Sequence, residues 1–415
     1  MEEEFAMFNF PIEDKSEKII KVIGVGGGGG NAVQHMWEEG VKNVTFLVVN
    51  TDSQVLSSNQ MPNKILLGKE GLGTGGDPEK GRKIAEEYVD EIEKMFDEET
   101  KMVFITSGMG GGTGTGVSPV IARVAKQKGI LTVGVVTLPF KMEGRKRISV
   151  ALKGMEELKK CVDSIIVINN EKLMQSDRYA DMSWEEGMKK ADEVLTITTK
   201  TIAEIITVQG KVNRDFNDIC TVMKDGGAAM VSVAKAEGEK RLFKAMQEAL
   251  NFPLIANVEK HQVKKMLYIV YSGTQNPAKI QELTEINDFM DGFSEDIEVL
   301  WGHYPDDSLG DDIKVSIVAT GFDNNDCPQW KKKDEQEQLT GLYEKYYKLP
   351  NKSIAELKSQ KSQEIETEDV EAKKPVSTSV PATDEKTEEK ENETHPFVSF
   401  FSSLGSKLGV FLEEQ

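Results

Sequence analysis

Glycine-rich segments constrain the fold of this 415-residue chain more than any other feature. Residues 107–116, SGMGGGTGTG, contain six glycines and no lysine, and they lie between an apolar run and a helix-like segment. Residues 24–33, GVGGGGGNAV, contain a GxGxxG arrangement, and residues 71–83, GLGTGGDPEKGRK, form a third cluster. Glycine lets a backbone approach a ligand closely, and the amides at a helix N-terminus favour phosphate. Tight turns alone do not explain three glycine-rich segments, so we expect the segments to surround one phosphate-bearing ligand.

Short apolar runs rich in β-branched residues alternate with helix-like segments from Lys18 to about Asn170. Unbroken apolar strands separated by helices indicate a parallel sheet covered on both faces, as in a Rossmann-like α/β domain. Ligands of such sheets bind at the carboxyl ends of the strands. Two of the glycine clusters follow strand-like runs directly, which places them at that edge.

One long helix follows the α/β region. Apolar residues recur at spacings of three and four from Trp184 to Ile205, and SWEE at 183–186 is a capping box, so we expect a helix over residues 183–209. The sequence then predicts a second α+β domain over residues 210–322. Its expected strands are 219–226, 228–238, 264–273, 297–304 and 313–322, and its expected helices are 239–251 and 277–292.

The rest of the chain has the composition of non-globular sequence. Residues 355–394 contain no aromatic residue and 12 acidic against 6 basic side chains. Too little apolar surface is available there to offset the entropy of ordering, and we predict a disordered linker over residues 323–395. Residues 396–415 turn apolar on one helical face and predict a short amphipathic segment. Residues 1–17 form an acidic N-terminal extension.

Charge and cysteine content exclude several function classes. The net charge of −19 argues against nonspecific nucleic-acid binding and against direct attraction to anionic lipid. Cys161, Cys220 and Cys327 are isolated, which favours a reducing, cytoplasmic compartment and disfavours a structural zinc site. The acidic N-terminus is unlike a signal peptide, and nothing later reaches the roughly 20 apolar residues of a membrane span.

The motifs together resemble one family. GGGTGTG at 110–116 is similar to the signature of the tubulin/FtsZ superfamily of GTPases. VIGVGGGGGNAV, NTDSQVL, GLGTGGDPEKGRK, TLPFKMEGRKR and NRDFND follow the pattern of the same family in order and spacing over roughly residues 18–322. The resemblance implies a GTP-binding domain at 18–182, a self-assembling GTPase that forms head-to-tail filaments, and a role in the cytokinetic ring of bacterial cell division.

The resemblance also implies a role for each segment of the nucleotide site. Backbone amides, helix dipoles and a bound Mg²⁺ would replace the missing lysine, with the metal held mainly by phosphates and water. Glu143 and Arg147 match positions near the sugar, Asn170 and Asp192 match positions that read guanine, and Met188 stands where the family usually has an aromatic residue. The positions that match the phosphate-binding residues are Gly27, Gly28, Gly29, Gly30, Asn31, Thr74, Gly75, Gly76, Gly111, Gly112, Thr113 and Gly114, of which Thr74 to Gly76 would sense the γ-phosphate.

Hydrolysis of a γ-phosphate needs an oriented water, and no obvious carboxylate to hold one lies inside the glycine loops. By resemblance, Asn213, Asp215 and Asp218 would act on the nucleotide of the next subunit, with the two aspartates orienting the water. Arg214 and Asn217 depart from the usual small or apolar residues of this loop. Such head-to-tail contact does not close on itself and therefore produces filaments.

Residues 396–415 suggest the partners. Their apolar face and nearly uncharged polar face predict docking to a division or membrane-tethering adaptor protein, so that membrane contact is indirect. Direct membrane insertion and folding back onto the chain's own core are the alternatives. We expect the protein in the cytoplasm at the division site, with no nucleic-acid partner.

Each of these predictions has a plainer alternative. Glu143 and Arg147 suit a solvated charged turn, Asp215 and Asp218 a polar helix cap, Met188 core packing and Asp192 a surface acid. For the whole chain, a nicotinamide or flavin oxidoreductase would use the 24–33 fingerprint but leave the clusters at 71–76 and 108–116 unused. A nucleotide-binding scaffold without turnover is the third function class.

Overall fold

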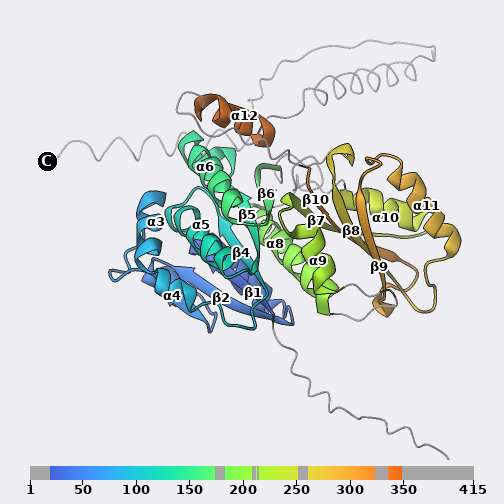
Figure 1. Cartoon of the computed structure of the whole chain (residues 1–415), viewed down its shortest axis with the longest axis horizontal. Coiled ribbons are helices and arrows are strands. Elements are labelled where there is room, and N and C mark those ends of the chain that lie inside the picture. Colours follow the sequence, from blue (N-terminus) through green and yellow to red (C-terminus); the bar gives the residue numbers. More distant parts are fainter. Residues whose placement is uncertain are drawn as a thin grey trace, which may run out of the picture. The chain divides into compact units, whose positions relative to one another are not determined.

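The computed structural model divides into a first unit, Met1–Lys348 (Figure 1), and a second, Leu349–Gln415. The described residues all belong to the first unit, and they are 19–172, 183–207, 212, 215–250, 260–322 and 335–347. The predicted N-terminal extension and the segment 396–415 therefore lie outside the described residues.

Ten strands of the described residues form a single sheet in the order β3-β2-β1-β4-β5-β6-β7-β10-β8-β9. The strands from β3 to β7 pair in parallel, whereas β10 runs antiparallel to both of its neighbours. The expected parallel α/β sheet is confirmed, and it continues without a break into the mixed second half. The strands are β1 (Ile20–Val25), β2 (Val44–Asn50), β3 (Lys64–Leu66), β4 (Met102–Gly108), β5 (Leu131–Leu138), β6 (Ser164–Asn169), β7 (Gly227–Ala236), β8 (Lys265–Ser272), β9 (Glu298–Pro305) and β10 (Ile313–Thr320).

Helices cover both faces of this sheet, which explains the unbroken apolar strands. In β1, Ile20 and Val22 pack into one core with α1 and α8, while Ile23 and Val25 pack into another with α5 and α6. A third core lies between the second half of the sheet and α10 and α11. The helices are α1 (Gly26–Glu38), α2 (Ser53–Ser58), α3 (Pro78–Glu87), α4 (Val89–Glu93), α5 (Gly112–Gln127), α6 (Arg145–Cys161), α8 (Trp184–Thr207), α9 (Phe216–Met223), α10 (Arg241–Leu250), α11 (Ile280–Met290) and α12 (Glu335–Tyr347).

The predicted central helix is present as α8. Its first turn is the expected capping box: the Ser183 amide donates to Glu186 Oε2 at 2.7 Å, and the Glu186 amide donates to Ser183 Oγ at 3.3 Å. The helix packs against α1 and β7, and the Tyr304 hydroxyl of β9 donates to the Ile205 carbonyl at 2.9 Å. One helix thereby joins the two halves of the sheet.

The prediction of a strand at residues 219–226 is wrong. Residues 216–223 form α9, because Asp215 accepts from the Asp218 amide at 3.0 Å and Asp218 accepts from the Asp215 amide at 3.1 Å. This capping box satisfies amides that an α-helix leaves free at its start. The apolar Ile219, Val222 and Met223 are buried at helical spacing, which a short apolar run does not distinguish from a strand.

The predicted disordered linker is wrong for residues 335–347, which form α12. Residues 355–394 contain no aromatic residue, whereas α12 contains Leu339, Leu342, Tyr343, Tyr346 and Tyr347. These side chains pack against the core that contains α5 and α6, so this stretch has the apolar surface that the later residues lack. The other residues of the predicted linker lie outside the described ones.

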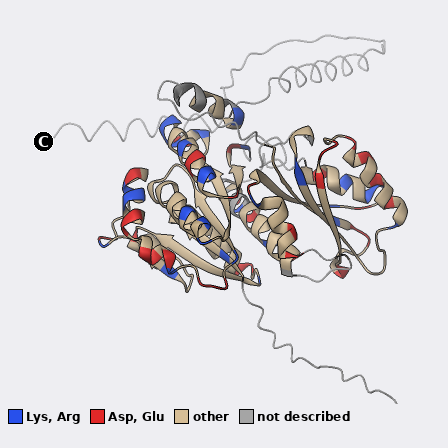
Figure 2. Ribbon diagram, in the orientation of Figure 1, with Lys and Arg blue, Asp and Glu red and all other residues tan. Residues whose placement is uncertain are grey.

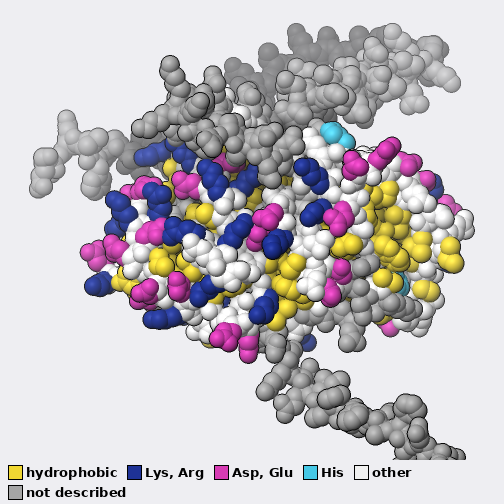
Figure 3. Space-filling model, viewed as in Figure 1, with side chains coloured by type: hydrophobic (Ala, Val, Ile, Leu, Met, Phe, Trp, Pro, Cys, Tyr) yellow, Lys and Arg dark blue, Asp and Glu magenta, His cyan; other side chains and the backbone are white. Residues whose placement is uncertain are grey.

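Charged side chains of both signs are interspersed over the side of α3 to α6 (Figure 3). Hydrophobic side chains gather on the other part of that face, over β8 and β9, where Trp301 is 39% exposed. Among the described residues, no helix combines enough length with enough apolar character to cross a bilayer.

The Arg241–Glu282 ion pair stabilises the second half of the sheet. Arg241 is 4% exposed and donates to Glu282 Oε1 at 2.7 Å, and this hydrogen bond holds the pKa of Glu282 below its ordinary 4.5. A lowered pKa means that the pair stabilises the fold above pH 4.5 and that this contribution is lost as the pH falls. Replacing Glu282 with glutamine should lower the free energy of unfolding by about 2 kcal/mol at pH 7, measured by urea denaturation.

The matched control is Glu86→Gln. Glu86 pairs with Arg123 at 2.6 Å, but both side chains are more than 40% exposed. This change should cost less than about 0.5 kcal/mol, because water screens the pair. Equal losses of unfolding free energy in the two variants would contradict this role of the buried pair. So would a loss in Glu282→Gln that stays the same size below pH 4.5.

Candidate functional site

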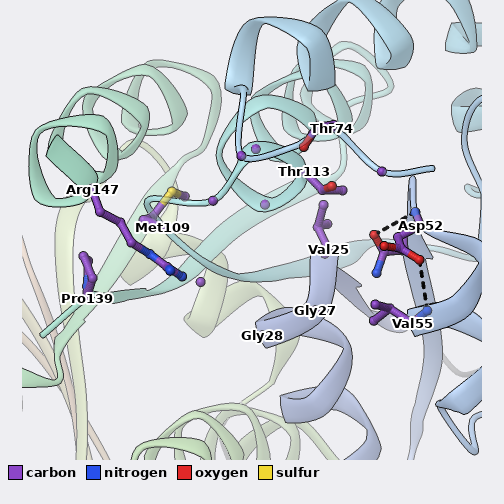
Figure 4. Close-up of a pocket in the computed structure, with 18 of the residues that line it drawn as sticks. Val25, Gly27, Gly28, Asp52, Val55, Thr74, Met109, Thr113, Pro139 and Arg147 are labelled. Carbon is purple, nitrogen blue, oxygen red and sulfur yellow. Dashed lines mark hydrogen bonds between the residues drawn. The ribbon is translucent and has the colours of Figure 1, made fainter. Parts of the chain in front are cut away.

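A cavity of about 550 Å³ opens at the carboxyl edge of the parallel sheet (Figure 4). Val25 at the end of β1, Asn50 at the end of β2, Gly108 at the end of β4 and Thr137 in β5 line it. Residues of all three glycine-rich segments form its walls, so the structure brings together parts of the chain that are far apart in sequence.

Besides α6, which begins beside this cavity, two helices begin at its glycine-rich walls with no side chain capping them among the described residues. These are α1, which starts at Gly26 with φ +73°, and α5, whose N-cap is Gly111. By contrast, Asp52 caps α2, Asp77 caps α3 and Asp215 caps α9. The amides of the first turn need acceptors. At α1 and α5 the cavity is where such an acceptor would sit, and an anion suits both places.

Backbone contact at glycines sets the position of α1. A Cβ on Gly29 would lie 2.3 Å from the Thr106 carbonyl oxygen of β4, and one on Gly24 would lie 2.4 Å from the Gly29 carbonyl oxygen. Only glycine fits at these two positions without a shift of backbone. The helix therefore starts close above β1 and β4, with Gly27 and Gly28 facing the cavity.

A second set of glycines brings α3 against α5. A Cβ on Gly116 would lie 2.1 Å from the Pro78 carbonyl oxygen, and one on Gly81 would lie 2.7 Å from the Gly112 carbonyl oxygen. This close crossing holds Thr74, Gly75 and Gly76 at the wall opposite α1. At the start of α5, the Thr113 hydroxyl is hydrogen-bonded to the Thr51 hydroxyl at 2.7 Å.

Charged groups lie at one side of the cavity, where α6 begins. Arg147 projects toward the cavity (Figure 4), and its Nε lies 3.0 Å from Glu143 Oε2. Glu143 in turn accepts from the Phe140 amide at 2.8 Å, which fixes the loop after β5. Figure 2 shows that Lys and Arg residues continue along α6 from this point. The pair can therefore offer both a hydrogen-bond acceptor and a cation to a polar ligand.

Asn170, which follows β6, supplies an acceptor. Asn170 is 7% exposed, it lines the cavity, and its Oδ1 has no hydrogen-bond partner within the described part of the chain. A buried acceptor without a partner costs about 1–3 kcal/mol. A ligand with N–H donors at this end of the cavity would remove that cost.

Most of the predicted binding residues meet at the cavity. Gly29 and Gly30 do not line it: they pack α1 against the sheet, and Asn31 is exposed on α1. Met188 and Asp192 belong to α8, but their side chains lie outside what the structure describes, as does Asn213. The predicted residues that line the cavity are Gly27, Gly28, Thr74, Gly75, Gly76, Gly111, Gly112, Thr113, Gly114, Glu143, Arg147 and Asn170.

Asp215 and Asp218 do not line this cavity. Residues of α9 instead line a separate pocket together with Lys101, Leu131 and Asp163, which lie at the starts of β4, β5 and β6. The strands are six to eight residues long. At about 3.3 Å per residue, α9 and the cavity are therefore separated by roughly 20 Å of sheet. Within one molecule, the two aspartates and the glycine walls lie at opposite edges.

Sequence reasoning missed several lining residues, among them Asn50, Asp52 and Phe140. Asp52 Oδ1 accepts from the Val55 amide at 3.1 Å, one of the dashed lines in Figure 4. The sequence does contain a signal for Asn50 and Asp52, because polar residues at the end of a buried parallel strand lie at the ligand-binding edge of the sheet. No group of three or more His, Cys, Asp or Glu side chains in the described residues is arranged to hold a metal ion.

Two family models match the chain. The Tubulin/FtsZ family GTPase domain matches residues 19–178, which include the cavity, and the FtsZ family C-terminal domain matches residues 227–323. The cell division protein FtsZ of Porphyromonas gingivalis (strain ATCC BAA-308 / W83) is 44% identical over 327 residues, which are 78% of this chain and 71% of that protein.

Solved structures resemble the fold as well. An empty FtsZ dimer from M. jannaschii has a TM-score of 0.65 and 38% identity, and the match covers 73% of this chain and 88% of that one. CetZ2 from Haloferax volcanii, solved as a GTPγS-bound protofilament, also has a TM-score of 0.65, covering 79% of this chain and 98% of that one. At 19% identity, this second likeness concerns the fold alone.

The two kinds of glycine in α1 should respond differently to a methyl group. Gly29→Ala should lower the free energy of unfolding by about 1–3 kcal/mol or more, because its Cβ would collide with the backbone of β4. Gly27→Ala should leave it unchanged or raise it by up to about 1 kcal/mol, because the nearest atom to its Cβ, on Val55, is 4.0 Å away. Urea denaturation of the ligand-free protein measures both, and similar losses in the two variants would refute the proposed packing.

Proposed function

The chain belongs to the FtsZ family of tubulin-like GTPases, and from this premise we propose how it binds GTP, assembles and completes its active site. As a family member it is a GTPase of the cell-division type and binds GTP and GDP. We infer that it assembles head to tail into filaments that build the cytokinetic ring in bacterial division.

The uncapped starts of α1 and α5 carry this proposal. The amides of Gly27, Gly28 and Gly111 to Gly114 would donate to the phosphates, with the Thr113 hydroxyl among them. Phosphate would thereby supply the acceptors that Asp side chains supply to α2 and α3. Thr74, Gly75 and Gly76, on the opposite wall, would contact the γ-phosphate. A dinucleotide oxidoreductase would use the α1 turn alone and leave the other two walls without a role.

The remaining predicted positions suit the nucleoside. Glu143, in the turn after β5, and Arg147, in the first turn of α6, would bind the ribose. Asn170 Oδ1 would accept an N–H of guanine and so gain the partner that it lacks. We keep Met188 and Asp192 as proposed guanine contacts from α8 and Asn213 as a proposed catalytic residue on the strength of the family motif.

The cavity suits Mg²⁺ held mainly by the nucleotide. The acids among the lining residues are Asp52, which caps α2, and Glu143, which is paired with Arg147, so the protein offers few oxygen ligands of its own. Mg²⁺ keeps several waters and binds through phosphates in such sites, where it would neutralise charge on the β- and γ-phosphates.

The positions of the aspartates support catalysis in trans. Asp215 and Asp218 lie at the sheet edge opposite the cavity, so they are too far away to orient a water there in the same molecule. A second subunit stacked head to tail brings its α9 edge to this cavity. Large apolar side chains at the cavity are exposed, with Leu72 at 78% and Met142, in the adjoining turn, at 70%. Such an apolar rim is typical of a protein–protein contact.

We propose that residues 396–415 recruit the protein to the division site through a membrane-tethering adaptor. Their pattern of phenylalanine and leucine favours docking of one helical face into a partner's groove. The cytoplasmic location at the division site is part of the same proposal.

Complementation between variants tests catalysis in trans. Asp218→Asn keeps a side-chain acceptor for the α9 cap and removes the charge. Alone it should bind GDP as the wild type does but hydrolyse GTP at less than about one-tenth of the rate, since an oriented water is worth 10²–10⁴-fold. Wild-type protein held below its assembly threshold should hydrolyse little GTP. Excess Asp218→Asn protein should then raise turnover severalfold, because wild-type Asp218 completes the variant's sites.

The control is Asp225→Asn, which removes a 75% exposed acid just beyond α9 and should behave as the wild type does. Phosphate release in the mixture equal to the sum of the separate rates would overturn the proposal. Turnover that is independent of protein concentration would overturn it too.

Removal of residues 396–415 separates recruitment from catalysis. The shortened protein should hydrolyse GTP and scatter light as the full chain does, because we propose that the segment acts only in recruitment. A fluorescent fusion of it should fail to concentrate at the division site. Loss of GTP hydrolysis on deletion would show instead that the segment is needed for the fold.

A further inference from the structure

The helix α12 lies in the region expected to be a linker, yet it docks next to the nucleotide cavity. It packs along α6 (Figure 1), and Tyr347, its last residue, is 2% exposed. Leu339, Leu342 and Tyr343 are partly buried in the same core. Tyr343 also stacks on Tyr347, with ring centroids 5.3 Å apart. The end of α12 is therefore held by packing on the core of the GTPase domain.

Two hydrogen bonds connect this end of α12 to segments that line the cavity. The Tyr347 hydroxyl donates to the Pro139 carbonyl at 2.7 Å, and Pro139 itself lines the cavity. The Asn169 side-chain amide donates to the Tyr346 carbonyl. Asn169 directly precedes Asn170, which lines the cavity and whose buried Oδ1 has no hydrogen-bond partner in the described structure.

These contacts fix two turns at the nucleoside end of the cavity. The segment after Pro139 leads to Phe140 and Glu143, which are joined by a hydrogen bond of 2.8 Å. Asn169 also accepts from the Glu171 amide at 3.0 Å through Oδ1, so both ends of its side-chain amide are used to hold the turn around Asn170. Burial raises the pKa of the Tyr347 phenol, which therefore stays a neutral donor at physiological pH.

We propose that α12 is a positioning element of the nucleotide site: by anchoring Pro139 and Asn169 it preorganises the loop and the asparagine that meet the nucleoside. The inference rests on the proposed binding of guanine nucleotide in this cavity. Tyr347 is a positioning residue, because it acts through Pro139 and does not touch the ligand. Since binding free energies are reciprocal, nucleotide in the cavity must also strengthen the docking of α12 by the same factor.

The affinity for GDP in the full-length protein tests this inference, measured by calorimetry at concentrations below assembly. Tyr347→Phe removes one hydroxyl and leaves the ring to pack. GDP should bind it about three- to tenfold more weakly, the range expected for one hydrogen bond. The matched control is Tyr304→Phe, which removes an equally buried hydroxyl that donates to the Ile205 carbonyl. It should lose stability but keep GDP affinity within about twofold.

Hydrogen exchange on the wild-type protein gives a second, independent readout. GDP should slow exchange of the amides of residues 335–347, and this protection should be smaller in Tyr347→Phe. Unchanged GDP affinity in Tyr347→Phe, or exchange in α12 that does not respond to GDP, would overturn the positioning role. If the wild type failed to bind GDP at all, the proposed nucleotide site itself would fail, and the two failures are thus distinguishable.

Discussion

Backbone contact through glycine is the constraint on which the site depends. Where Gly29 meets Thr106 and Gly116 meets Pro78, even a methyl group would overlap a carbonyl oxygen. These contacts bring the starts of α1 and α5 and the 74–76 loop around one space. The glycines are therefore of two kinds. Some pack helices against their neighbours, and others, such as Gly27, leave amides open to the cavity.

This construction supplies binding but no chemistry. Amide dipoles, a Thr hydroxyl and one ion pair surround the cavity, and no carboxylate of the described lining residues is free of a structural bond. The two aspartates that suit a water-orienting role cap α9 at the far edge of the same sheet. A parallel sheet separates its two edges by the length of its strands, so a second molecule is the simplest source of the missing group.

The sequence predicted what local patterns determine. Glycine spacing predicted the cavity walls, apolar runs predicted the buried strands, and the SWEE capping box predicted where α8 begins. It did not predict α9 as a helix, because Ile219 to Met223 is too short a run for periodicity to decide, although the plainer alternative for Asp215 and Asp218, a polar helix cap, is what the structure shows. The sequence did not predict α12, because the helix is held by contacts with residues far away in the chain. The Tyr347 hydroxyl, for example, donates to the Pro139 carbonyl, more than 200 residues earlier. Asp52 likewise lines the cavity only because the fold brings the carboxyl ends of several strands together there.

We propose that one subunit alone holds GTP in an incomplete active site. Single-turnover cleavage of prebound GTP, followed from dilute protein through the concentrations at which light scattering reports assembly, tests it most directly. We expect a cleavage rate constant that is near zero in dilute protein and rises in proportion to the assembled fraction. The same rate constant in dilute and assembled protein would contradict it.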